Sequence, residues 1–119
     1  MNKLKFAGIL PALMTAFGDD GIDKDKIKRH IKRLAAAGVN GFYVGGSSGE
    51  MVLCSVSERK HLLEAAVEAV DELGERLAVI VHTGAMSTSD ALDLTRHAEK
   101  AGATAVSSVT PLYYKYSFT

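Results

Sequence analysis

Two adjacent hydroxyls in a glycine-rich loop are the groups in this chain best suited to hold a ligand. Residues 41–50 read Gly-Phe-Tyr-Val-Gly-Gly-Ser-Ser-Gly-Glu, a short apolar run that ends abruptly at the loop. A buried strand would deliver such a loop, and its glycines let the backbone approach a ligand closely. Ser47 and Ser48 add hydroxyls and backbone N–H groups, which suit a small carboxylate or phosphate. The sequence predicts a small-anion site here, and a tight strand-to-helix turn with a serine cap is the equally open alternative.

The loop fits neither of the two common nucleotide-binding fingerprints. A P-loop requires a lysine after its last glycine, where this chain has Glu50. The dinucleotide pattern Gly-x-Gly-x-x-Gly does not fit residues 45–49. A glutamate at this point would also repel a polyphosphate. The expected ligand is therefore a small anion.

A second polar cluster holds three tyrosines in four residues, at positions 113, 114 and 116. The tyrosine cluster follows an apolar run, so we expect it to lie on the same face of the sheet as residues 45–50, the serine loop. Phenolic groups at such a place can relay protons or bind a substrate. Aromatic packing against another element or subunit is the alternative, which the local pattern favours slightly.

Other reactive side chains give weaker signals. His82 ends a predicted strand on the same face, but its neighbours supply no metal-ligand set, so we interpret it as structural. Cys54 is the only cysteine and cannot form an internal disulfide, which fits a cytoplasmic location; we expect a small core residue. None of the nine lysines lies in an apolar strand, where a Schiff-base amine would be desolvated.

Alternating apolar runs and amphipathic segments predict the elements that position these groups, in the order βαβαβαβ. Helices between near-continuously apolar strands imply a parallel sheet with right-handed crossovers. Periodicity leaves two architectures open, a flavodoxin-like open sheet or part of a (β/α)₈ barrel. The predicted strands are 9–14, 42–44, 77–81 and 105–109; the helices begin at caps Asp23, Ser55 (a capping box with Glu58) and Ser87, and stop at Gly38, Gly74 and Gly102.

Composition limits the partners of the chain. Its 119 residues suffice for one small domain, with 47% apolar and 24% charged residues, as in ordinary globular proteins. Fourteen basic residues balance fourteen acidic ones, which gives no electrostatic case for nucleic acid or an anionic membrane. No apolar run is long enough to span a bilayer, and the first residues make a poor signal peptide.

Taken together, four stretches resemble the N-acetylneuraminate lyase and dihydrodipicolinate synthase family. The chain looks closest to the lyase branch, because of Tyr-Val-Gly-Gly-Ser at 43–47 and Tyr-Tyr-Lys-Tyr-Ser-Phe at 113–118. Ser48 stands where the family usually has a threonine, and it keeps the hydroxyl. The matching stretches read Gly-Ile-Leu-Pro-Ala-Leu-Met-Thr at 8–15, Tyr-Val-Gly-Gly-Ser-Ser-Gly-Glu at 43–50, Ser-Glu-Arg at 57–59 and Val-Thr-Pro-Leu-Tyr-Tyr at 109–114.

The resemblance implies a (β/α)₈ barrel and class I aldolase chemistry, in which a lysine forms a Schiff base with pyruvate or a sialic acid. N-acetylneuraminate lyases cleave sialic acid to N-acetylmannosamine and pyruvate. By the same resemblance, Ser47 and Ser48 would hold the substrate carboxylate. Tyr113 matches a catalytic tyrosine near a subunit interface that relays protons with the first hydroxyl. A homotetramer is implied, and neither a metal nor an organic cofactor is.

The resemblance also exposes a deficit, because a full barrel needs about 250 residues. Residues 1–119 would form one partial barrel domain with strands 1–4 and helices 1–3. The family's Schiff-base lysine and proton-donating tyrosine lie on later strands. We therefore expect the chain alone to be inactive and to self-associate through its open edges. Three alternatives stay open: dihydrodipicolinate synthase or another pyruvate aldolase, a non-catalytic half-barrel acting as a relic or scaffold, and a flavodoxin-like anion binder.

Overall fold

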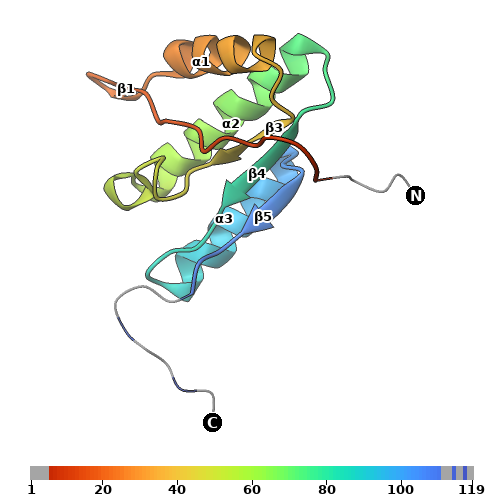
Figure 1. Ribbon diagram of the computed structural model, residues 1–119. Helices are drawn as coiled ribbons and strands as arrows, with labels where there is room; N and C mark the ends of the chain where they lie inside the picture. Colours follow the sequence, from red (N-terminus) through yellow and green to blue (C-terminus); the bar gives the residue numbers. More distant parts are fainter. Residues whose placement is uncertain (1–5, 111–113, 115–116, 118–119) are drawn as a thin grey trace.

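A computed structural model describes residues 6–110, 114 and 117 of the chain (Figure 1). A short hairpin comes first, and helices then alternate with parallel strands, which confirms the predicted α/β class. The elements are β1 (Phe17–Gly18), β2 (Gly21–Ile22), α1 (Lys24–Ala36), β3 (Gly41–Val44), the 3₁₀ helix η1 (Met51–Leu53), α2 (Val56–Leu73), β4 (Ala78–His82), α3 (Thr88–Ala101) and β5 (Ala105–Ser107).

The main sheet holds β3, β4 and β5 in chain order, all parallel. Tyr43 lies opposite Ile80, which in turn lies opposite Ala105. A flavodoxin-like sheet would place the first strand between the second and the third. Here β3 pairs directly with β4, and the segment before it pairs on the outer side of β3 at Ala12. The order is that of consecutive barrel strands, so the flavodoxin-like alternative is wrong.

The predicted first strand, residues 9–14, is an extended segment rather than a regular strand. It makes one isolated parallel bridge, between Ala12 and Tyr43. The backbone N–H of Leu13 donates to the Tyr43 carbonyl at 2.8 Å, and the Tyr43 N–H donates to the Pro11 carbonyl at 2.9 Å. Because Pro11 has no N–H, the ladder cannot extend through it. The segment still runs beside β3 in the predicted direction.

The helices begin where the sequence predicts. Ser55 and Glu58 form the predicted capping box: Glu58 N–H donates to Ser55 Oγ at 3.1 Å, and Ser55 N–H donates to Glu58 Oε2 at 2.7 Å. Asp23 caps α1 and Ser87 caps α3 through their side chains. These caps satisfy backbone donors that the first helical turn leaves free.

The helix ends also follow the prediction. Gly74 and Gly102 close α2 and α3 in the left-handed conformation, with φ of 66° and 89°. Ala37 is the C-cap residue of α1, and Gly38 follows it with φ of 92°. Glycine adopts these angles without the steric cost that a Cβ brings.

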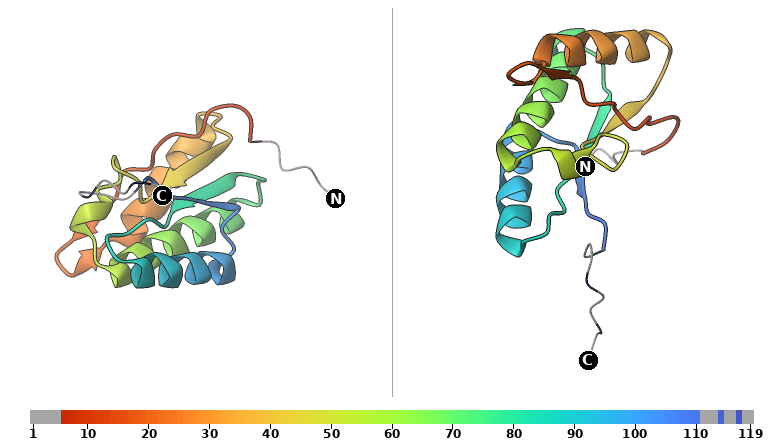
Figure 2. Two further views of the ribbon diagram at one scale, coloured as in Figure 1. Left: turned by 90° about the horizontal axis from the view of Figure 1, so that it is seen from below. Right: turned by 90° about the vertical axis from the view of Figure 1, so that its left-hand side faces the viewer.

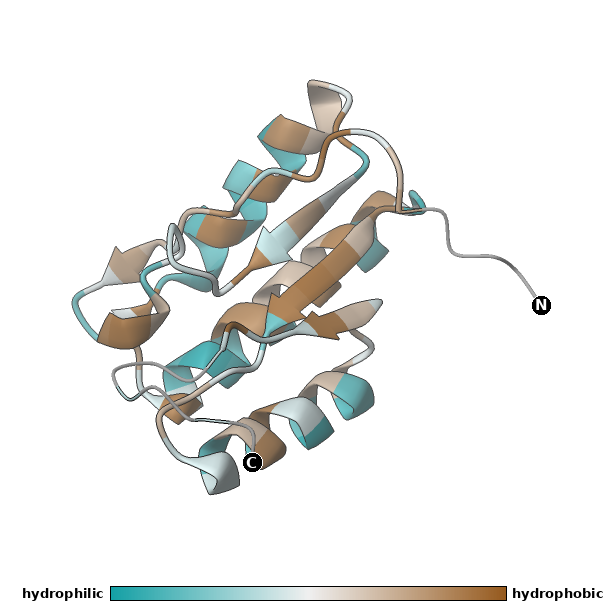
Figure 3. Cartoon of the chain, turned by 60° about the horizontal axis from the view of Figure 1, so that its bottom comes forward, coloured by the Kyte–Doolittle hydropathy of each residue, from teal (hydrophilic) through white to brown (hydrophobic). Residues whose placement is uncertain are grey.

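The core lies between the sheet and the helices. Figure 2 shows the three helices in one layer against one side of the sheet. In the part of the chain that the structure describes, no helix covers the other side. Brown apolar segments accordingly run along the strands and the sheet-facing sides of the helices in Figure 3. Buried core side chains include Phe42, Val44, Val79 and Val81 of the strands and Ile27, Ile31, Leu62, Leu63, Ala66, Val70, Leu94 and Ala98 of the helices.

Two further observations complete the fold. Residues 18–21 form the tip of an antiparallel hairpin in which Phe17 pairs with Ile22, a pairing that the sequence did not predict. None of the helices described here combines the length and the apolar character needed to cross a membrane.

The capping box of α2 gives a direct test of this fold. We expect Ser55→Ala to lower the free energy of unfolding by about 1 kcal/mol, because the Glu58 N–H loses its acceptor. Urea unfolding followed by circular dichroism measures the change. Ser57→Ala is the matched control, since this exposed serine lies inside the helix and not at its cap. An equal loss of stability in both variants would contradict the assignment.

Candidate functional site

The carboxyl ends of the three parallel strands meet at one edge of the sheet, where ligands bind in open and closed α/β sheets. Residues 45–50 follow β3, residues 83–87 follow β4 and residues 108–110 follow β5 (Figure 1). The N–H of Thr83 donates to the Ser107 carbonyl at 2.8 Å, which ties the last two of these segments together. The described residues that lead into the tyrosine cluster, 108–110, therefore follow a strand at the same edge as residues 45–50.

The serine loop is a compact turn whose hydroxyl-bearing residues remain exposed. Gly45 has φ of 67°, and Gly46 and Gly49 are buried while Ser47 and Ser48 are exposed. The N–H of Glu50 donates to the Ser47 carbonyl at 3.0 Å and closes the turn. The loop thus buries its glycines and presents its two serines to solvent.

Close packing leaves little room for side chains at the glycines of the loop. A Cβ at Gly46 would lie 2.5 Å from Cε1 of Tyr43. A Cβ at Gly49 would lie 3.2 Å from the Leu13 carbonyl oxygen. Thr15 Oγ1 also donates to the Gly49 carbonyl and fixes the loop to the first segment. The loop is therefore held in place from two sides.

The loop is a tight turn from strand β3 to the 3₁₀ helix η1, as the alternative interpretation predicts, but no serine of the loop caps that helix. Ser55 caps α2, while Glu50 precedes η1 without a side-chain cap. Glu50 has φ of 58° and is the only residue other than glycine with positive φ in the described part of the chain. A left-handed residue of this kind carries a modest steric cost. Neither Ser47 nor Ser48 is used as a helix cap, so both hydroxyls are available to a ligand.

Tyr43 belongs to this edge, although sequence reasoning did not select it as a site residue. Its hydroxyl donates to Ser107 Oγ at 3.1 Å, which links β3 to β5 across β4. Residues alternate between the faces of a strand. Since Phe42 and Val44 are buried against the helices, the period of two places Tyr43 on the opposite face. The alternation of faces along the strand was the sequence signal that could have identified Tyr43.

Arg59 is the second residue that the sequence analysis missed as a contributor to this edge. It is only 8% exposed, and its guanidinium donates to the carbonyls of Gly84 at 2.9 Å and His82 at 2.8 Å. Its Nε is buried and has no hydrogen-bond partner among the described residues. Burial lowers the pKa of Arg59 from its usual range, since the charged form is desolvated. Its place in the buried stripe, three and four residues before Leu62 and Leu63, was the signal.

His82 has the structural role that the sequence predicts. It is 2% exposed at the end of β4, and its Nε2 accepts the N–H of Val109 at 3.1 Å. Its Nδ1 lies 3.3 Å from Nη2 of Arg59. Burial, and then the charge of Arg59, lower the pKa of His82 below its usual 6.5, so the ring is neutral at neutral pH.

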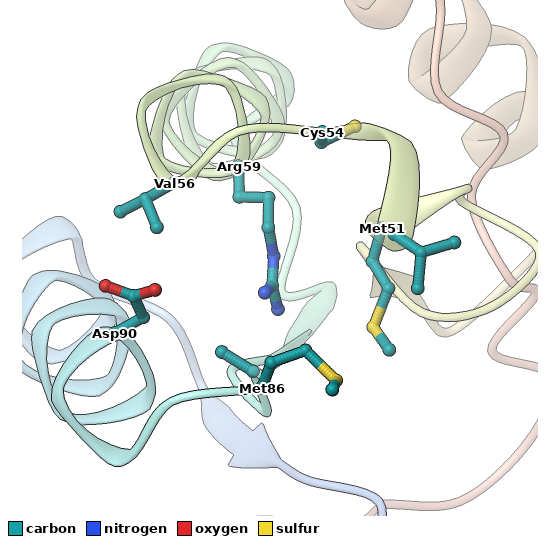
Figure 4. A pocket seen from close by; sticks show the side chains of 8 residues that line it. Met51, Cys54, Val56, Arg59, Met86 and Asp90 are labelled. Carbon is teal, nitrogen blue, oxygen red and sulfur yellow. The ribbon is translucent and has the colours of Figure 1, made fainter. Parts of the chain in front are cut away.

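A cavity of about 260 Å³ lies beside Arg59, between the start of α2 and the loop after β4. Figure 4 shows Arg59 extending from α2 toward Met86, with Met51 on one side and Asp90 on the other. The wall of the cavity is mainly apolar, and Arg59 and Asp90 are its charged residues. The lining residues are Met51, Val52, Cys54, Val56, Arg59, Ala85, Met86 and Asp90.

Cys54 lines this cavity and is only partly buried, so the expectation of a core residue is wrong. Its thiol lies 3.5 Å from the Glu50 carbonyl oxygen. Burial raises the pKa of the Cys54 thiol, which keeps it protonated and weakly nucleophilic. Within residues 6–110, 114 and 117, no group of three or more His, Cys, Asp or Glu side chains is placed to hold a metal ion.

The tyrosine cluster is only partly visible. Tyr113, the candidate proton relay, lies outside the described residues, as do Lys115 and Tyr116. Tyr114 is exposed, and Thr110 is exposed at the end of the segment that follows β5. Val109 and Thr110, which precede the cluster, lie at the same carboxyl edge of the sheet as the serine loop.

Comparisons with known proteins bear on this arrangement. The N-acetylneuraminate lyase of Rhizobium meliloti is 41% identical over 115 residues, which are 96% of this chain and 38% of that protein. A sialic acid aldolase of Ruminococcus gnavus superposes with a TM-score of 0.87 at 32% identity, over 94% of this chain and 36% of the other.

A third relative is YagE, a prophage protein of the dihydrodipicolinic acid synthase family from Escherichia coli K12, solved in complex with pyruvate. It superposes with a TM-score of 0.87 at 34% identity, over 94% of this chain and 37% of its own. The chain thus spans less than two fifths of the length of each of these relatives. Residues 5–119 match the dihydrodipicolinate synthetase family. With its parallel strands in barrel order, the chain is an N-terminal part of a (β/α)₈ barrel and belongs to the dihydrodipicolinate synthetase family.

Proposed function

We propose that this chain is the N-terminal part of a class I aldolase, an N-acetylneuraminate lyase that cleaves sialic acid to N-acetylmannosamine and pyruvate. The observation that carries the proposal is the exposed pair Ser47–Ser48 at the carboxyl edge of a parallel sheet. The 41% identity to a curated lyase supports the choice of the lyase branch.

In this proposal the serine loop binds the carboxylate of the substrate. A carboxylate accepts hydrogen bonds only, so it pairs with hydroxyls and backbone N–H groups. Bonds of this kind to a charged acceptor are shorter and stronger than neutral ones. The Thr15 hydroxyl anchors the loop at the Gly49 carbonyl, and Gly46 lies too close to the ring of Tyr43 to carry a Cβ, so the donors of the loop are positioned before the ligand arrives.

The reactive groups are assigned as follows. Tyr113 relays protons together with Ser47, near a subunit interface. The Schiff-base lysine lies outside this chain, because β3, β4 and β5 contain no lysine. Residues 1–119 form one partial barrel domain that orients the keto acid, and the covalent step belongs to later strands. This division needs neither a metal nor an organic cofactor.

The proposal extends to partners and location. The partner is a small keto acid or sialic acid, and the location is cytoplasmic. The assembly is a homo-oligomer, a tetramer in the complete enzyme. Exposed apolar side chains contribute to its interface: Val52 and Met86 of the cavity wall are 74% and 69% exposed, and Leu53, next in the chain to Val52, is 71% exposed. Contiguous exposed apolar side chains are typical of interaction surfaces.

Another pyruvate-dependent aldolase of the family, such as dihydrodipicolinate synthase, is the second candidate. The observation that favours it is the likeness to YagE, a protein of that family solved with pyruvate. Both candidates use the serine loop for the same keto-acid carboxylate. They differ in the second substrate, which groups beyond this chain would read. A non-catalytic half-barrel is the third candidate, and it predicts no carboxylate binding.

Pyruvate binding tests the serine loop directly. In ¹H–¹⁵N spectra of the chain, we expect pyruvate to shift the amide signals of Ser47 and Ser48. Replacing both residues by alanine should weaken binding about tenfold or more, because two donors to a charged group are lost. Ser57→Ala, an exposed serine on α2, is the matched control. Pyruvate that leaves both amides unchanged, or binds the double variant equally, would contradict the assignment.

Reductive trapping tests the division of labour. We expect borohydride treatment of the chain with pyruvate to yield no covalent adduct, because its described lysines lie on or near helices rather than in a desolvated strand. Intact-mass spectrometry measures the outcome. Lactate in place of pyruvate is the control for non-specific modification, since it has no keto group. An adduct specific to pyruvate would show that this chain holds a competent amine.

A further inference from the structure

A line of polar contacts joins α2, β4 and the end of β5 at the carboxyl edge. Arg59 Nη2 donates to the His82 carbonyl at 2.8 Å and lies 3.3 Å from the Nδ1 of the same residue. On the other side of the ring, His82 Nε2 accepts the N–H of Val109 at 3.1 Å. The regular pairing of β5 with β4 ends at Ser107. Two residues further on, the His82 ring bonds the backbone of Val109 in place of a strand partner.

Donors face both nitrogens of the imidazole. The guanidinium of Arg59 has only donors, and a backbone N–H is also a donor. A neutral imidazole has one acceptor nitrogen, so it can satisfy one of the two. The tautomer with its proton on Nδ1 accepts the Val109 N–H, while Arg59 keeps its bond to the His82 carbonyl. Protonation adds an N–H at Nε2, which removes the acceptor and places a donor against the Val109 N–H.

We propose that His82 is a positioning residue of this edge: with its backbone carbonyl held by Arg59, its neutral ring fixes the end of β5 through Val109, and its protonation releases that end. The inference does not depend on the aldolase assignment. It gives the edge a built-in response to acid, since the segment that leaves β5 is secured by an acceptor that disappears when the ring takes up a proton.

The charges around the ring support this response. From α2, Arg59 contacts the ring, and its positive charge opposes a second one on His82. Cys54 and Asp90 of α3 interact electrostatically with Arg59 and raise its pKa, which opposes part of the lowering by burial. From the β5 side the ring meets the Val109 N–H, and the Ser108 hydroxyl donates to the Val109 carbonyl. Among the described residues, no carboxylate contributes to the lowering of the His82 pKa, which comes from burial and then from the charge of Arg59.

The space for the ring depends on Gly84. A Cβ at this position would lie 2.8 Å from His82 Cε1 and 3.0 Å from Nε2, and 2.6 Å from Ser108 Oγ. The turn after β4 therefore fits closely around the imidazole on the side where it meets β5. Arg59 holds the same turn through the Gly84 carbonyl at 2.9 Å.

The linkage has a defined sign. Because the pKa of His82 is lowered in the folded chain, folding favours the neutral ring. The stabilisation is complete above the usual value of 6.5, and it is lost as the pH falls from there through the lower folded pKa. Release of the β5 end should follow the same window.

Nuclear magnetic resonance of the 119-residue chain tests the proposal. We expect ring ¹⁵N shifts of His82 to show Nδ1 protonated and Nε2 free near neutral pH. From about pH 8 to about pH 5, the protection factor of the Val109 amide should fall about tenfold as His82 titrates, relative to the amide of Val81 within the ladder. A proton on Nε2 in the neutral ring, or pH-independent protection of Val109, would overturn the proposal.

Variants separate the ring from general acid effects. His82→Gln offers an amide oxygen as acceptor without a proton to gain, so Val109 protection should become independent of pH. His61→Gln is the matched control, because His61 is an exposed histidine of α2, and this variant should behave as the unmodified chain does. If His82→Gln does not fold, the titration of the unmodified chain decides alone. Equal pH dependence in both variants would contradict the role of His82.

Discussion

The register set at the amino ends of β3 and β4 determines where the functional groups lie. Gly41 pairs with Ala78 so closely that a Cβ on Gly41 would collide with the Ala78 carbonyl. Asn40 continues the contact: its carbonyl accepts the Ala78 N–H at 3.1 Å, and its side chain accepts the Ile9 N–H at 2.9 Å. Since a parallel strand cannot slip by one residue without turning every side chain to the other face, this lock aligns the opposite edge as well.

At that opposite edge, backbone pairing gives way to side chains. Arg59 is a buried cation that takes neutral carbonyls of the loop after β4 as its partners. Desolvation of a charge is costly, and hydrogen bonds to carbonyls offset part of the cost. These bonds position the backbone: the Arg59 side chain of α2 fixes the turn after β4 and, through His82, the end of β5. The strand ends that carry the candidate site are thereby tied to the helix layer.

Local signals in the sequence predicted the helices well, because capping and glycine stops depend on residues close in the chain. Ser55 with Glu58, and Gly74 and Gly102, lie where expected. The sequence failed where the outcome depends on distant partners. Pro11 reduces the first predicted strand to a single bridge, and the roles of Arg59 and Tyr43 depend on groups 23 to 64 residues away. The sequence located the serine loop, but only the positions of η1 and α2 show that neither Ser47 nor Ser48 caps a helix.

The one-sided fold also explains what the serine loop can do by itself. Helices cover one face of the described sheet, and Ser47 and Ser48 are exposed to water. Hydrogen bonds to a carboxylate are strong where the dielectric is low, and water competes with them at an open edge. In a complete barrel, layers of inward side chains fill the interior and further loops surround the carboxyl edge. Under the proposed function, the same two hydroxyls would therefore bind a keto acid weakly on this chain and more tightly within a closed barrel, without any change in their own geometry.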